Sequence, residues 1–127
     1  MILLDTCALL WWTKDPEKLS ARAAKVCKKI DLSGGAISSI SIWELGIKIQ
    51  KRKLDIGMSL NSYVEMLKFL NLEIHPVTAA VWMKNIGLNW KNRDPADRTI
   101  VATAALLELP ILTADGEMRR FYKKAIW

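Results

Sequence analysis

The sequence predicts an α/β sandwich built around a small, mainly parallel sheet. Hydrophobic patterning alternates along the chain between short apolar runs and longer amphipathic ones, and turn residues separate these segments. Such alternation is typical of strands that take turns with helices, an order that produces a parallel sheet covered by helices. The 127 residues contain no internal repeat and no low-complexity linker, so we expect a single domain over residues 1–127.

Short apolar segments predict the strands. The opening Ile2–Leu4 is too short for a helix and stops at Asp5, as a buried strand would. The later segments are residues 36–38, 72–77 and 110–113, followed by a helical turn and an edge strand within residues 118–127.

Segments with apolar residues three or four positions apart predict the helices. They are residues 8–13, 20–30, 41–53, 59–70, 78–90 and 94–107. Two of these helices begin with capping patterns. Ser41 precedes Glu44 by three positions, as in a capping box, and Asp94 stands before Pro95, which suits the first helical position.

The composition excludes several classes of protein. Hydrophobic residues make up 51% of the chain and charged residues 25%, a balance that fits neither a disordered nor a membrane protein. The N-terminus lacks the pattern of a secretory signal, and no apolar run approaches the roughly 18 residues of a membrane span. We therefore expect a cytoplasmic protein with free thiols at Cys7 and Cys27 and no membrane association. A net charge of +6 favours an anionic partner, nucleic acid first.

Four acidic residues lie at the ends of predicted elements. Asp5 and Asp115 follow strands, whereas Glu44 and Asp97 stand in the first turns of helices. Parallel strands end at one edge of a sheet, and the helices that follow them begin at that edge, where α/β proteins place their sites. The four acids can therefore meet in one pocket, although Asp5 and Asp115 are far apart in sequence.

Acidic residues gathered in this way indicate metal-assisted phosphodiester chemistry. Several carboxylates cannot remain ionised together without a cation, and oxygen ligands suit Mg²⁺ or Mn²⁺. One or two such ions would activate water as the nucleophile and neutralise charge on phosphoryl oxygens. The chain offers little else, because His75 is its only histidine and no glycine-rich phosphate loop is present.

Plainer readings of the same residues stay open at this point. Glu44 and Asp97 can serve as helix-start acids and nothing more. The protein would then be a non-catalytic RNA-binding module with a basic face. A third reading makes Asp5 the phosphoacceptor of a phosphatase-like domain.

The order of four short motifs resembles PIN-domain ribonucleases of the VapC toxin type. The motifs are Asp5-Thr6, Ser41-Ile42-Trp43-Glu44, Arg93-Asp94-Pro95-Ala96-Asp97-Arg98 and Leu112-Thr113-Ala114-Asp115, and together they extend over essentially the whole chain. The resemblance implies a three-layer α/β/α domain and a metal-dependent endoribonuclease, the toxin of a toxin–antitoxin pair. It also implies a homodimer and a small antitoxin that blocks the active site.

The resemblance also assigns roles to individual residues. Asp5, Glu44, Asp97 and Asp115 match the acidic quartet that holds Mg²⁺ or Mn²⁺, and Thr6, Thr113 and Asp94 match supporting positions, with Asp94 as a cap. Cys7 departs from the histidine that is common at its position. Cations near the acidic motifs are candidates for the RNA backbone, namely Lys48, Arg52, Arg93 and Arg98. The basic run 119–124, which includes aromatic residues, can touch RNA or close the core.

Overall fold

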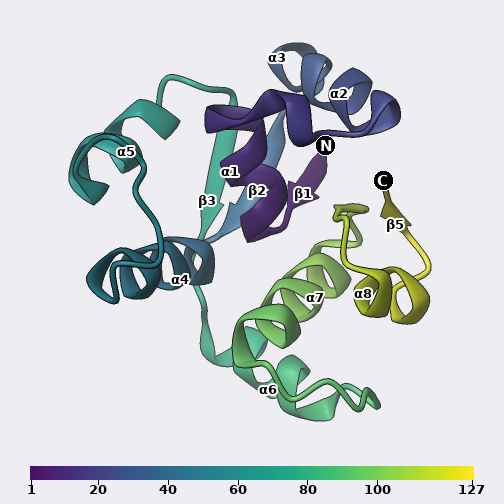
Figure 1. Ribbon diagram of the computed structural model, residues 1–127. Helices are drawn as coiled ribbons and strands as arrows, with labels where there is room; N and C mark the ends of the chain where they lie inside the picture. The colour runs from purple at the N-terminus through teal and green to yellow at the C-terminus, as the bar shows by residue number, and fades with distance from the viewer.

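A five-stranded parallel sheet forms the centre of the computed structural model, which describes all 127 residues (Figure 1). The strand order is β3-β2-β1-β4-β5, and every neighbouring pair is parallel. The strands are β1 Ile2–Leu4, β2 Gly35–Ser38, β3 Leu72–His75, β4 Ile111–Leu112 and β5 Ala125–Ile126. Helices cover both faces, so the architecture is the three-layer α/β/α domain that the resemblance implies.

Eight α-helices and one short 3-10 turn connect the strands. They are α1 Thr6–Lys14, η1 Pro16–Lys18, α2 Ala21–Lys28, α3 Ile30–Ser33, α4 Ser39–Gln50, α5 Leu60–Leu67, α6 Ala79–Gly87, α7 Pro95–Leu107 and α8 Gly116–Phe121. The segment expected as one helix over residues 20–30 is divided between α2 and α3. None of the helices combines the length and the apolar character needed to cross a membrane.

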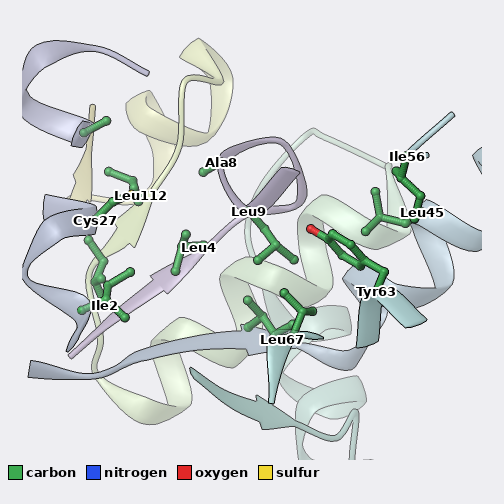
Figure 2. Close-up of a cluster of buried hydrophobic side chains, with 13 residues drawn as sticks. Ile2, Leu4, Ala8, Leu9, Cys27, Leu45, Ile56, Tyr63, Leu67 and Leu112 are labelled. Atoms are coloured by element: carbon green, nitrogen blue, oxygen red, sulfur yellow. The ribbon is translucent and has the colours of Figure 1, made fainter. Parts of the chain in front are cut away.

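Alternation along the strands builds two hydrophobic cores, one on each face of the sheet. Ile2 and Leu4 of β1 point into a cluster that also holds side chains of α1 to α5, among them Leu9 and Tyr63 (Figure 2). Leu3, between them in sequence, points to the other face and packs under α7 and α8. Because successive side chains of a strand point to opposite faces, three residues of β1 serve both cores.

Helix α4 begins earlier than its capping pattern predicts. Its N-cap is Ser38, whose hydroxyl accepts a hydrogen bond from the amide of Ile40. Ser41 is fully buried one turn further on, and its hydroxyl is hydrogen bonded to Thr6. The capping box at Ser41 is therefore wrong, and Glu44 lies inside the helix rather than at its first turn.

The topology brings several element ends to one edge of the sheet. Strands β1, β2 and β4 are adjacent and parallel, so their carboxyl ends lie together, and α1, α4 and α8 start there. Figure 1 shows α7 passing between α4 on one side and α8 on the other. This is the edge at which the four acidic residues were expected.

Candidate functional site

The four acidic side chains line one pocket, a cavity of about 280 Å³. Asp5 follows β1, Glu44 comes from α4, Asp97 comes from the first turn of α7, and Asp115 follows β4. The remaining lining residues are Thr6, Cys7, Trp11, Ile100 and Ala114. The fold thus assembles residues from the whole length of the chain at one point.

Asp5 is held at the floor of the pocket by both of its carboxylate oxygens. Its Oδ1 accepts a hydrogen bond of 2.8 Å from the amide of Ala8, which makes Asp5 the N-cap of α1. Its Oδ2 accepts a hydrogen bond from the hydroxyl of Thr113. The residue is only 6% exposed, so the orientation of this carboxylate is fixed by the fold.

The expected hydroxyl residues connect the elements around the pocket. Thr113 also accepts, at 3.0 Å, from the amide of Asp115, and this places the start of α8 against β4. Asp115 in turn caps α8 through Oδ1, which accepts from the amides of Glu117 and Met118. On the opposite wall, the hydroxyl of Thr6 lies 2.9 Å from that of Ser41 and joins α1 to α4.

The carboxylate of Asp97 does not cap a helix. The N-cap of α7 is Asp94, whose Oδ1 accepts from the amide of Asp97 at 2.9 Å. The carboxylate of Asp97 lines the pocket instead, where its Oδ2 accepts from Asn92 at 3.1 Å. Asp94 therefore caps α7, and the carboxylate of Asp97 is left to line the pocket.

The pocket gathers four carboxylates, and few cationic side chains lie close enough to neutralise them. Lys48 lies 4.0 Å from Glu44, and Asp5, Asp97 and Asp115 form no ion pair. Burial, reinforced by the neighbouring carboxylates, raises the pKa of Asp5 to about 6 and that of Asp97 to about 6. The site therefore attracts either protons or a cation.

The donor set fits a hydrated Mg²⁺ or Mn²⁺ ion. All four acidic groups offer oxygen, the ligand that these ions prefer, and the low exposure of Asp5 without a basic partner calls for a cation. No three carboxylate, imidazole or thiol side chains surround one point closely enough to enclose an ion. Mg²⁺ is usually bound by one or two carboxylates and keeps several waters, so the donors fit without such an enclosure.

The match to a known family decides the classification. The sequence pattern of the PIN domain matches residues 2–124, nearly the whole chain. This chain belongs to the PIN-domain family. The resemblance noted from the four acidic motifs is thereby confirmed.

This PIN domain is similar to a named ribonuclease and, in fold, to chains of solved complexes. The ribonuclease VapC22 of Mycobacterium tuberculosis is 27% identical over 119 residues, which cover 93% of this chain and 89% of that protein. A toxin–antitoxin complex from Klebsiella pneumoniae contains a chain with a TM-score of 0.68 and 17% identity, covering 100% of this chain and 97% of that one. VapBC2 from Rickettsia felis, bound to a promoter DNA fragment, contains a chain with a TM-score of 0.67 and 18% identity. The match covers 100% of this chain and 98% of that one. At these identities the solved structures show the fold.

Arg98 stabilises the segment of residues 85–92, which leads from the end of α6 towards α7 in the PIN domain. Its guanidinium donates to the backbone carbonyls of Asn85, Leu88, Trp90 and Asn92 at 2.6 to 3.0 Å, and to the Asn85 side chain at 3.3 Å. These bonds fold residues 85–92 against α7 and bring Asn92 to Asp97. The guanidinium is occupied by protein carbonyls, so we do not propose it as an RNA contact.

The other cations proposed for RNA differ in their distance from the acids. Lys48 pairs with Glu44 at the rim of the pocket. Arg52, just after α4, and Arg93, just before α7, are both exposed and do not line the pocket. Their part in binding stays a prediction.

The tail divides its aromatic and basic residues between packing and solvent. Phe121 stacks on Trp90 with ring centroids 4.8 Å apart, and the hydroxyl of Tyr122 donates to the carbonyl of Leu109. Arg119 and Arg120 are exposed. The aromatic residues of the run 119–124 thus help to close the second core.

Asn92 is the site residue that sequence reasoning missed. Its Oδ1 accepts from the amide of Asp94 and its Nδ2 donates to Asp97, so it links the loop to the helix start. An asparagine two positions before a helix cap is a turn signal. That signal locates a turn, but only the folded loop shows that the amide reaches the carboxylate.

Proposed function

We propose that this protein is a Mg²⁺- or Mn²⁺-dependent endoribonuclease and the toxin of a toxin–antitoxin pair. The observation that carries the proposal is the pocket of four carboxylates, three of them without an ion pair, in a PIN domain with a net charge of +6. When bound, the ion supplies hydroxide from water and neutralises charge on the phosphoryl oxygens. Basic side chains outside the pocket hold the RNA backbone.

The acidic residues have different parts in this scheme. Asp5 and Asp115 are fixed by hydrogen bonds at strand ends, so they hold the cation in a constant position. Asp97 keeps Oδ1 free of hydrogen bonds within the chain and lines the pocket, which places it to accept a proton from the attacking water. Glu44 lines the pocket from α4 and adds a fourth carboxylate to the site.

Two alternative functions are less well supported. A phosphoacceptor must be reached by a whole phosphoryl group, whereas Asp5 is only 6% exposed. A non-catalytic RNA-binding module would use the acids as caps. Asp5, Asp94 and Asp115 do cap helices, but Glu44 lies inside α4 and Asp97 presents its carboxylate to the pocket.

The proposed partners follow from the relatives. The solved structures of similar fold include a toxin–antitoxin complex from Klebsiella pneumoniae. We propose a small cognate antitoxin that blocks the acid pocket, a homodimer and RNA substrates in the cytoplasm.

Cleavage of total RNA by an Asp97→Asn variant tests the function. With Mn²⁺ present, the variant should lose at least about 100-fold in rate, because a general base typically contributes about 100- to 10,000-fold. Asp31→Asn, an exposed acid of α3, is the matched control and should cleave as wild type does. Cleavage by Asp97→Asn at the wild-type rate would refute the proposal.

A further inference from the structure

A second hollow adjoins the acid pocket between α4 and the start of α7. This α4 groove has a cavity volume of about 260 Å³ and shares Glu44 with the acid pocket as a common wall. Its lining residues are Trp43, Glu44, Ile47, Lys48, Lys51, Lys53, Asp94, Pro95 and Ala96. A chain-like ligand that occupies the acid pocket can continue directly into it.

The groove presents an aromatic face followed by cations. Trp43, Ile47 and Lys51 are spaced by four positions, so they follow one another along one side of α4. Lys48 and Lys51 lie about 6 and about 10 Å beyond Glu44 along the helix axis. Lys53, past the end of the helix, lines the same groove.

Packing does not account for Trp43. Trp43 is 55% exposed, and its ring stacks on no other aromatic ring. By contrast, Trp90 stacks on Phe121 and Trp11 contacts Trp127. Cations at a helix end explain Lys48 and Lys51 through the helix dipole. They explain neither an uncovered indole nor Lys53.

We infer that the α4 groove binds the nucleotides of a single-stranded RNA next to the scissile phosphate, with a base stacked on Trp43 and phosphates at Lys48, Lys51 and Lys53. This inference rests on the proposed ribonuclease function and adds a binding subsite to it. The three lysines favour an anionic strand. An indole beside them favours a nucleic acid with accessible bases, which a duplex does not offer.

Binding to two oligomers that differ only in their bases tests the inference. The probes are a fluorescein-labelled oligoadenylate of about 12 nucleotides and an abasic ribose-phosphate oligomer of equal length. Binding is followed by anisotropy with Mg²⁺ in the Asp97→Asn background, so that cleavage does not interfere. Trp43→Ala should weaken oligoadenylate binding by about 5- to 150-fold, the usual cost of losing one stacked base. Binding of the abasic oligomer should change by less than about twofold.

Matched variants separate stacking from general effects. Trp82 of α6 is also exposed, at 43%, and lies outside the groove, so Trp82→Ala should bind both probes as the parent does. The double variant Lys51→Ala, Lys53→Ala should weaken both probes alike and lower the salt slope by about 0.7 for each lost phosphate contact. Removal of Lys25 and Lys28, exposed on α2, should change neither quantity.

The outcomes distinguish this inference from the proposed function. If Trp43→Ala binds both probes as its parent does, or weakens both equally, no base stacks there and the inference is wrong. It is equally wrong if Trp43→Ala binds RNA normally but no longer co-purifies with its antitoxin, because the groove then holds a protein segment. Failure of the wild-type protein to cleave RNA with Mn²⁺ would refute the ribonuclease instead.

Discussion

Thr113 donates a hydrogen bond to Oδ2 of Asp5 across 108 positions of sequence. The bond joins the carboxyl ends of β4 and β1 and fixes the most buried carboxylate of the acid pocket. Thr113 also accepts from the amide of Asp115. One buried hydroxyl therefore orients two of the four acidic residues.

Replacing Thr113 by valine should destabilise the protein and shift the titration of Asp5. The buried Oδ2 of Asp5 loses its donor, and an unsatisfied buried group costs about 1–3 kcal/mol. The partly buried amide of Asp115 also loses its acceptor. The hydrogen bond from Thr113 lowers the pKa of Asp5, so its loss should raise that pKa further and move half-maximal Mn²⁺ binding to higher pH. Urea unfolding and Mn²⁺ titrations at several pH values measure both effects.

Thr113→Ser is the control for this prediction. It keeps the hydroxyl, so Mn²⁺ binding should depend on pH as in the wild type. An unchanged pH dependence in Thr113→Val would mean that the hydrogen bond has no influence on Asp5.

Arg98→Lys should destabilise the protein although it keeps the charge. The planar guanidinium reaches four backbone carbonyls at once, and an ammonium group cannot reproduce that geometry. We expect a loss of about 1–3 kcal/mol in the free energy of unfolding, measured in urea. Arg93→Lys, at an exposed position nearby, should stay within about 0.5 kcal/mol of the wild type; equal stability of the two variants would contradict the role given to Arg98.

The buried carboxylate of Asp5 should make the metal-free protein less stable as the pH rises. The folded state raises the pKa of Asp5 from 3.8 to about 6, so it binds this proton more tightly than the unfolded chain does. The stability contributed by the proton is present below about pH 4 and is lost as the pH rises to about 6. In EDTA, Asp5→Asn should therefore gain in Tm relative to wild type between pH 4 and pH 7, and Asp31→Asn should not. A constant difference in Tm across that range would show that Asp5 titrates normally.

Much of this architecture follows from local pattern. Ile2–Leu4 is short, apolar and ends at an acid, and it forms β1 with the predicted bounds. Parallel strands then dictate that Asp5 and Asp115 share an edge of the sheet, so their proximity could be predicted from the sequence. The capping of α7 by Asp94 is also local, because the amide that it binds is three residues away.

Other features depend on long-range packing and could not be predicted in this way. Ser38, Ser39 and Ser41 are all suitable N-caps. The structure uses Ser38, whereas the hydroxyl of Ser41 is hydrogen bonded to the distant Thr6. The role of Arg98 depends on how residues 85–92 fold back on α7. The α4 groove likewise arises from the approach of α7 to α4, which no spacing within α4 reveals.

The central claim is that the acid pocket performs cleavage with a bound divalent cation. The most direct test compares Mn²⁺ binding, followed by the electron paramagnetic resonance of free Mn²⁺, with the single-turnover rate of RNA cleavage over the same titration. The two curves should coincide for the wild-type protein, and Glu44→Gln should lose both binding and cleavage. Cleavage that persists in EDTA, or that Glu44→Gln retains without binding Mn²⁺, would contradict the account.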